Sequence, residues 1–301
     1  MKTLRLFLQL SRPLFLLGAA LTYALGVGIA RYLGTSVDWN LYMLGQAWVT
    51  AFQLSAHYLS EYFAEPDDAY QGNGSFFLGR SGALGPGKLA RPVALWAGVA
   101  CLAVGASLSV LLMGQAHYAP AVLLVMGLIF AGAVCYSVPP LRLEASGYGE
   151  LTISLMVANL VPALAFLLQT GELHRLLAMA TFPLTVLHLA MMLAFDLPDY
   201  AGDLRCGKRT LMVRAGWQRG MLLHNILVFS GFILLGLAAA MGLALRIVLP
   251  TFFVLPVGLL QVWQMMRIEQ GDKPNWTLLV LAALTSFGLT AYLLAYGFWT
   301  R

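Results

Sequence analysis

The amino-acid sequence predicts an all-α membrane protein whose helices form one bundle of nine transmembrane spans. Three observations predict this class. Of the 301 residues, 60% are hydrophobic and 10% are charged, and the mean hydropathy is +0.78, far from the composition of an ordinary soluble domain. Apolar segments of about 20 residues, the length that crosses about 30 Å of hydrocarbon, recur along the chain. The basic residues fall mostly in alternate loops, so the net charge of +5 relates to membrane orientation and we expect no nucleic-acid partner.

The nine segments follow one another with short connections and make a single domain, residues 1–301. The first begins at Pro13 after three basic residues, and it continues past the length of the apolar region of a signal peptide. Several segments are hydrophobic on all sides, as helices in contact with lipid are, and their internal prolines are tolerated in a helix bundle. In chain order, the expected spans are residues 13–33, 40–63, 93–114, 119–137, 150–169, 174–196, 219–243, 246–267 and 275–299.

Individual segments have features that support their place in this series. The segments 93–114, 119–137 and 275–299 contain no formal charge, as membrane-crossing helices require. The segment 174–196 is free of charge from Phe182 to Phe195 and then ends in an acid. The remaining segments have their charged residues at or near their ends, where side chains reach the membrane surface.

The distribution of the basic residues predicts the orientation. With the N-terminus in the cytoplasm, fourteen of the eighteen Lys and Arg residues lie on the cytoplasmic side, which is a strong positive-inside bias. An even number of spans would break this alternation. We therefore expect a multi-pass protein of the cell membrane with its N-terminus in the cytoplasm and its C-terminus outside. The four exceptions are Arg31, Arg175, Arg246 and Arg301.

Two long cytoplasmic loops, 64–92 and 197–218, each begin with a cluster of acids. Spacings of three and four place the acids of the second cluster within about 60° of one another on a helix. Acids at the end of a membrane span are costly unless they bind something, although a solvated helix end is the simpler alternative. The two clusters contain seven of the thirteen acids of the chain: Glu61, Glu65, Asp67, Asp68, Asp196, Asp199 and Asp203. Of these, Asp67 is better explained as a solvated loop residue.

These clusters suggest a site for magnesium and a diphosphate. Mg²⁺ prefers oxygen ligands and is often held by one or two carboxylates together with substrate phosphates. Neutralising a leaving diphosphate would let an allylic C–O bond ionise and expose a carbocation to a nucleophile. Basic side chains on the same side of the membrane would bind the phosphate oxygens. The candidates for this role are Lys208, Arg209, Arg80 and Arg142.

Three segments resemble the UbiA superfamily of intramembrane prenyltransferases. The first is Asp196-x-x-Asp199-x-x-x-Asp203, which continues to Gly207-Lys208-Arg209-Thr210-Leu-x-Val-Arg-x-Gly216 and is similar to the second aspartate-rich motif of that family. The second runs from Tyr136 to Leu143 and on through Gly147-Tyr-Gly-Glu150-Leu, and it is similar to the family's middle loop. The third is Arg12-Pro13 at the start of the first span. The resemblance implies a nine-span fold and a Mg²⁺ cofactor, and the predicted orientation places the site on the cytoplasmic side.

The first aspartate-rich motif departs from the family pattern of Asn-Asp-x-x-Asp-x-x-x-Asp. Ser60 stands in place of Asn, Glu61 in place of the first Asp, and Ala64 in place of the second. Glu65 lies one position from the missing carboxylate, and Pro66 disfavours a continuous helix there. Carrying the family's roles across gives six metal ligands: Glu61, Glu65, Asp68, Asp196, Asp199 and Asp203. In the middle loop, Glu144 and Ser146 replace residues that are commonly basic.

The resemblance also assigns further site residues. Asp199, Asp203, Lys208 and Tyr136 are the predicted catalytic residues, and the aromatic face of Tyr136 would stabilise a carbocation, although anchoring at the interface also explains a tyrosine at a span end. His57 is either a ligand or a proton acceptor in place of the family's Asn, or a group hydrogen-bonded between helices. Asn159 either lines the acceptor pocket or joins two helices. The predicted substrate-binding residues are Lys208, Arg209, Arg142, Arg80, His57, Ser60 and Asn159.

The leading functional hypothesis is a prenyltransferase that moves a polyprenyl group from its diphosphate to an aromatic acceptor in the membrane. The segment Gly207–Arg214 most resembles the branch that prenylates 1,4-dihydroxy-2-naphthoate in menaquinone biosynthesis. Prenylation of 4-hydroxybenzoate or a tetrapyrrole, and terpene cyclisation, are the alternatives within the family. From other classes, an ion-coupled transporter would place its acids near the midplane, and a non-catalytic lipid-binding relative would explain the loss of an acid at Ala64. The sequence leaves the oligomeric state open.

Overall fold

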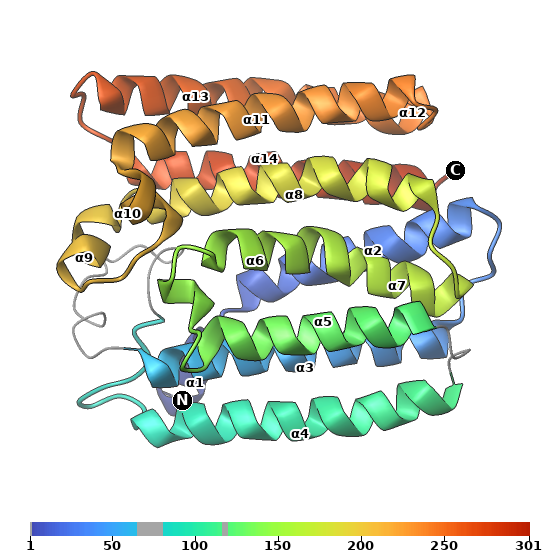
Figure 1. The fold of residues 1–301 in the computed structure, drawn as a ribbon, viewed down its shortest axis with the longest axis horizontal. Coiled ribbons are helices and arrows are strands. Elements are labelled where there is room, and N and C mark those ends of the chain that lie inside the picture. Colours follow the sequence, from blue (N-terminus) through green and yellow to red (C-terminus); the bar gives the residue numbers. More distant parts are fainter. Residues whose placement is uncertain (1, 65–80, 116–119) are drawn as a thin grey trace.

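The computed structural model describes residues 2–64, 81–115 and 120–301, and it consists of helices packed side by side (Figure 1). No β-strand occurs in these three ranges. The helical bounds are α1 Lys2–Ser11, α2 Pro13–Tyr32, α3 Trp39–Phe63, α4 Arg91–Gln115, α5 Pro120–Ser137, α6 Gly149–Leu155, α7 Val161–Thr170, α8 Arg175–Asp196, α9 Tyr200–Arg205, α10 Leu211–Ala215, α11 Trp217–Ala240, α12 Leu245–Val248, α13 Leu255–Glu269 and α14 Trp276–Trp299. The predicted all-α class is confirmed.

Eight helical segments in the described part of the chain are long and apolar enough to cross a membrane. They correspond to eight of the nine expected spans. The ninth, residues 40–63, is the 25-residue helix α3, which is less apolar because Gln, His, Ser and Glu side chains lie along it. The count of nine spans therefore stays a prediction, as does the orientation. Figure 1 shows the two termini toward opposite ends of the bundle, the arrangement that an odd number of crossings produces.

Two expected spans are interrupted rather than continuous. The span predicted at 150–169 consists of α6, a π-helical turn at Met156–Leu160, and α7. The span predicted at 246–267 consists of α12, a 3-10 segment at Leu249–Val254, and α13. Proline explains both breaks, because Pro162, Pro250 and Pro256 lack an N–H and their rings crowd the preceding turn. Helix α1 was not expected, and it ends where Arg12 adopts a left-handed backbone with φ 49°.

Helix α2 lies at the centre of the bundle, between α7 and α14. Gly26 lets α2 approach α7 closely, since a Cβ placed there would lie 2.1 Å from the carbonyl oxygen of Pro162. On the other side, the indole N–H of Trp299 in α14 donates to the carbonyl of Ala24 in α2 at 2.8 Å. The first and last long helices are therefore neighbours, although about 275 residues separate these contacts in the chain. The pairs α3–α4 and α8–α11 also pack against each other.

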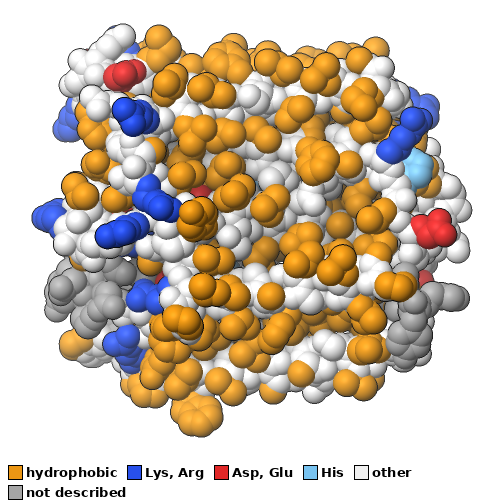
Figure 2. All heavy atoms as spheres, viewed as in Figure 1, with side chains coloured by type: hydrophobic (Ala, Val, Ile, Leu, Met, Phe, Trp, Pro, Cys, Tyr) orange, Lys and Arg blue, Asp and Glu red, His pale blue; other side chains and the backbone are white. Residues whose placement is uncertain are grey.

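The surface divides into an apolar middle and charged ends. Figure 2 shows hydrophobic side chains over the middle of the visible face, whereas Lys, Arg, Asp and Glu gather toward its left and right ends. Helices α9 and α10 lie at the left end in the same view (Figure 1). This pattern is the one expected of a membrane protein whose helix axes cross the bilayer. The acids of the second cluster belong to the end that carries α9 and α10.

Candidate active site

A cavity of about 360 Å³ opens among α2, α3, α6, α8 and α14 and extends to the segment around α9. At the α9 end its wall is polar, and it includes Asp196, Asp199, Asp203, Lys208, Arg12, Glu144 and Glu150. Further along the helices the wall is apolar, and it includes Phe15, Leu21, Phe52, Ile153, Met191, Leu284 and Phe287. A cavity that is apolar in depth with a few converging polar groups is the usual form of a small-molecule site. This one suits an amphiphile with a charged head and an apolar tail.

The second acidic cluster lies where α8 ends and α9 begins. The three acids do not share one continuous helix, because Pro198 interrupts it between Asp196 and Tyr200. The backbone still holds them together: the N–H of Asp199 donates to the carbonyl of Asp196 at 3.1 Å, and that of Asp203 to Asp199 at 2.9 Å. All three acids line the cavity. The sequence thus predicted that these acids lie together. The break at Pro198 means that backbone hydrogen bonds across a turn, and not one continuous helix, hold them in place.

Lys208 completes this cluster. Its ammonium group lies 3.4 Å from an oxygen of Asp203, and its backbone N–H donates to the Asp203 carbonyl at 2.9 Å. Burial, and after it the charge of Asp203, raise the pKa of Asp199 to about 6, although Lys208 opposes the rise. The cluster therefore carries more negative charge than its one lysine balances, which favours the binding of a cation.

Two glutamates of the middle loop face the same cavity. Glu144 forms an ion pair with Arg142 at 3.7 Å and accepts a hydrogen bond from the Ser60 hydroxyl. Glu150 is only 4% exposed, and one of its oxygens accepts from the N–H of Leu211 at 2.9 Å. Gly149 makes this arrangement feasible, because a Cβ there would lie 2.7 Å from the Cα of Glu144.

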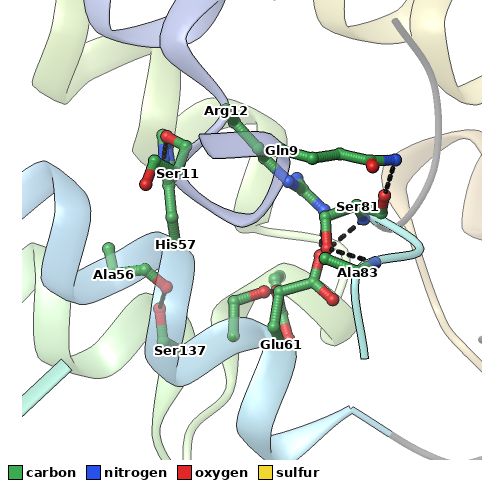
Figure 3. A network of polar contacts seen from close by, with 11 residues as sticks. Gln9, Ser11, Arg12, Ala56, His57, Glu61, Ser81, Ala83 and Ser137 are labelled. Carbon is green, nitrogen blue, oxygen red and sulfur yellow. Dashed lines mark hydrogen bonds and ion pairs between the residues drawn. The ribbon is translucent and has the colours of Figure 1, made fainter. Parts of the chain in front are cut away.

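Glu61, the described member of the first acidic cluster, pairs with a basic side chain (Figure 3). Glu61 at the end of α3 accepts from the Arg12 guanidinium at 2.6 Å and from the N–H of Ser81 at 2.7 Å. Glu61 does not line the cavity, whereas Arg12, His57 and Ser60 do. The left-handed backbone of Arg12, rare for a residue with a side chain, turns the chain between α1 and α2 beside this network. Glu65, Asp67, Asp68 and Arg80 lie outside the described residues.

The sequence profile of the UbiA prenyltransferase family matches residues 80–287, well over half of the chain. The chain belongs to the UbiA prenyltransferase family. The predicted family and enzyme class, a prenyltransferase, are therefore confirmed at this level. No curated protein sequence matches the chain significantly.

Solved structures agree with the family in their fold. A UbiA homolog from Archaeoglobus fulgidus bound to GPP and Mg²⁺ has a TM-score of 0.71 and 16% identity, and the match covers 98% of each chain. The same homolog bound to DMAPP and Mg²⁺ has a TM-score of 0.69 and 16% identity, again over 98% of each chain. A structure described for a digeranylgeranylglyceryl phosphate synthase has a TM-score of 0.60 and 15% identity, and the match covers 100% of this chain and 98% of that one. At these identities the likeness concerns the fold.

The structure of this UbiA-family chain brings some of the predicted residues to the cavity and leaves others away from it. Arg209 is exposed, and Arg142 reaches the cavity only through its ion pair with Glu144. Asn159 donates to the Thr181 hydroxyl at 3.0 Å and so joins two helices, which is the second of the alternatives above. His57 contacts the carbonyl of Ser11 at 3.2 Å and lines the cavity. The predicted residues on the cavity wall are Asp196, Asp199, Asp203, Lys208, Tyr136, His57 and Ser60.

Three functional candidates were missed. Arg12 was noted as the residue before the first span, and Glu144 and Glu150 only as parts of the middle loop. For Glu150 a signal was present, since it begins an apolar span in the same way that Asp196 ends one. Arg12 reaches the site through its left-handed turn, and Glu144 through its approach to α3. Both features depend on tertiary packing, which the sequence does not display.

The donor set of this cavity fits a divalent cation that the substrate helps to bind. Within the described ranges no three acids, histidines or cysteines converge closely enough to hold a metal by themselves. Mg²⁺, however, commonly takes only one or two carboxylates and completes its shell with water and phosphate. One buried oxygen of Asp196 and one of Glu150 have no hydrogen-bond partner. Carboxylate oxygens are hard donors of the kind that Mg²⁺ prefers, and both residues line the cavity.

Proposed function

We propose that this UbiA-family protein transfers a prenyl group from a prenyl diphosphate to an aromatic acceptor within the membrane. The observation that carries the proposal is one cavity that joins an acid-rich end containing Lys208 to an apolar interior. A diphosphate with Mg²⁺ suits the first part and an isoprenoid chain suits the second. The structures of the Archaeoglobus fulgidus homolog, bound to GPP or DMAPP together with Mg²⁺, support this assignment of the two parts.

The residues of the polar end would bind and orient the diphosphate. Asp196, Asp199 and Asp203 would hold the magnesium, and Lys208 and Arg12 would donate to phosphate oxygens. When bound, the cation neutralises the leaving diphosphate and so lowers the barrier to C–O cleavage. Glu61, paired with Arg12 at 2.6 Å, would serve to fix the direction of that guanidinium rather than to bind metal.

The apolar wall would protect the reacting carbon. Tyr136 and Phe195 both line the cavity near its polar end, and aromatic faces attract a cationic centre. Phe15, Met191 and Phe287 would surround the prenyl chain and exclude water, which would otherwise capture the carbocation. After the C–O bond has broken, the acceptor would attack the carbocation through a ring carbon, and the proton displaced from that carbon would pass to the released diphosphate.

For the acceptor we propose 1,4-dihydroxy-2-naphthoate, and hence a place in menaquinone biosynthesis. The support is the sequence Gly207-Lys208-Arg209-Thr210-Leu-x-Val-Arg, which resembles that branch of the family. We further propose that the site faces the cytoplasm of a cell membrane, since fourteen of eighteen basic residues fall on that side by the alternation of the loops.

The test is an assay of the purified protein in lipid nanodiscs with Mg²⁺, prenyl diphosphates of several lengths and a panel of aromatic acids. We expect release of pyrophosphate together with a prenylated aromatic product. Pyrophosphate release without such a product would show a cyclase or hydrolase instead. No release from a folded protein under any combination would refute the proposal.

A further inference from the structure

We propose that Glu150 is a direct ligand for a divalent cation, which it shares with Asp196 across the polar end of the cavity. The proposal rests on the proposed function in one respect, namely that the cavity holds a cation with a diphosphate. It goes beyond that function by adding an oxygen donor from the start of α6 to the acids of the second cluster. The ligand class is a small, hard cation such as Mg²⁺ or Mn²⁺.

Glu150 is a carboxylate that folding has removed from water but has only half satisfied. The side chain lines the cavity and is 4% exposed. One oxygen accepts from the Leu211 N–H at 2.9 Å, whereas the other, Oε2, is buried and has no hydrogen-bond partner. A buried polar atom without a partner is costly. An oxygen of this kind on a cavity wall indicates that a bound group supplies the missing interaction.

The charges around Glu150 call for a positive partner. Asp196 and Glu150 are close enough to share a hydrogen bond when one of the two carboxyl groups is protonated, whereas with both groups ionised Asp196 Oδ2 is buried without a partner. Lys208 pairs with Asp203, and Arg142 pairs with Glu144. Among the described basic side chains none forms an ion pair with Glu150. A cation bound between the two carboxyl groups would give both of these buried oxygens a partner.

The backbone around Glu150 fixes its carboxylate in the orientation that a ligand needs. Its first oxygen is tied to the start of α10, and the turn containing Glu144 packs directly against Gly149. Rigid second partners of this kind orient metal ligands and raise affinity about 10–100-fold. By contrast, Glu61 of the first cluster is engaged by Arg12 and Ser81 away from the cavity wall. Glu150 would thus supply an oxygen from a second element, close to Asp196.

The experiment measures Mn²⁺ binding to the full-length protein in nanodiscs by electron paramagnetic resonance, with and without inorganic pyrophosphate. Glu150→Gln is compared with the wild type and with the matched control Glu172→Gln, an exposed glutamate in the loop after α7. We expect the Mn²⁺ dissociation constant to rise about tenfold or more in Glu150→Gln and to stay within about twofold in the control.

Unfolding in EDTA separates loss of a ligand from loss of the fold. The amide of Glu150→Gln still accepts from Leu211 and can donate to Asp196, so this variant should unfold at or above the wild-type temperature without metal. If Glu150→Gln fails to fold, Glu150→Asp keeps the charge with a shorter reach, and it should fold and bind Mn²⁺ more weakly than the wild type.

Unchanged Mn²⁺ affinity in Glu150→Gln, or in Glu150→Asp where the first variant does not fold, would overturn the proposal and leave a shared proton as the explanation of the pair. This result is distinct from failure of the proposed function. If only the proposed function fails, the wild type binds Mn²⁺ through Glu150 yet releases no pyrophosphate from any prenyl diphosphate. Conversely, turnover by a wild type whose Mn²⁺ affinity does not depend on Glu150 would refute only the role of Glu150.

Discussion

The charge of Asp199 should make the metal-free protein less stable at neutral pH than in mild acid. Burial and the nearby Asp203 raise the pKa of this carboxyl from its ordinary value of 3.8 to about 6. A carboxyl whose pKa is raised by folding disfavours the folded state once it ionises. Its cost is absent below the unfolded pKa, grows between about pH 4 and pH 6, and is complete above that range. Replacing Asp199 by Asn should remove this part of the pH dependence.

The expected size follows from the shift in pKa. Two units correspond to about 3 kcal/mol as an upper limit, and the partial exposure of Asp199 reduces this to about 1–2 kcal/mol because water screens the charge. Asp199→Asn should therefore stabilise the metal-free protein by about 1–2 kcal/mol at pH 7.5 and by nearly nothing at pH 4. For a chain of this size, the change amounts to a few degrees in unfolding temperature.

The assay is thermal unfolding in detergent with EDTA from pH 4 to pH 8, for the wild type, Asp199→Asn and Glu172→Gln. Other acids titrate in the same range, so the informative quantity is the difference between wild type and variant at each pH. The same variant should lose turnover when Mg²⁺ and a prenyl diphosphate are added. Equal stabilisation at all pH values, or destabilisation at pH 7.5, would refute the reasoning about this carboxyl.

Three further predictions test other parts of the structure. Lys208→Met should lower kcat/KM for the prenyl diphosphate by about 100-fold, because it removes a charge-assisted contact to phosphate. Inorganic pyrophosphate should also inhibit the variant more weakly, and an unchanged inhibition constant would contradict the assignment of Lys208 to diphosphate binding. Gly26→Ala should destabilise the protein by about 1–3 kcal/mol because the new methyl group meets the Pro162 carbonyl, whereas Gly127→Ala, with open space around it, should not change the unfolding temperature. Met191→Trp, in the apolar wall, should favour short prenyl donors over long ones by about tenfold, and equal loss for all lengths would argue against a tail site there.

The sequence predicted the helices and the second acidic cluster well because both depend on local information. Apolar length identifies a span in any context, and the spacing of Asp196, Asp199 and Asp203 survives the kink at Pro198, since a kink between neighbours in the chain moves them little. The interruption at Met156–Leu160 was not predicted, because Pro162 can be tolerated in a helix that stays regular.

Contacts between distant segments were beyond the sequence. The pairing of Glu61 with Arg12 joins residues 49 positions apart, and the contact of Glu150 with Leu211 joins residues 61 positions apart. Motif matching placed Glu61 among the metal ligands by position alone, whereas the structure directs its carboxylate to a guanidinium. Which of several acids faces a cavity is set by packing, and a single sequence contains no direct record of it.

The contact between α2 and α14 has a consequence for how the protein is made. Leu284, Phe287 and Gly288 of α14 form part of the cavity wall, and Trp299 binds the backbone of α2. Synthesis runs from the N-terminus, so α2 is made long before α14. The wall of the cavity beside α2 therefore stays incomplete until α14 has packed against it. A chain without α14 would lack this part of the wall, and its cavity would lie open on the side that α14 covers.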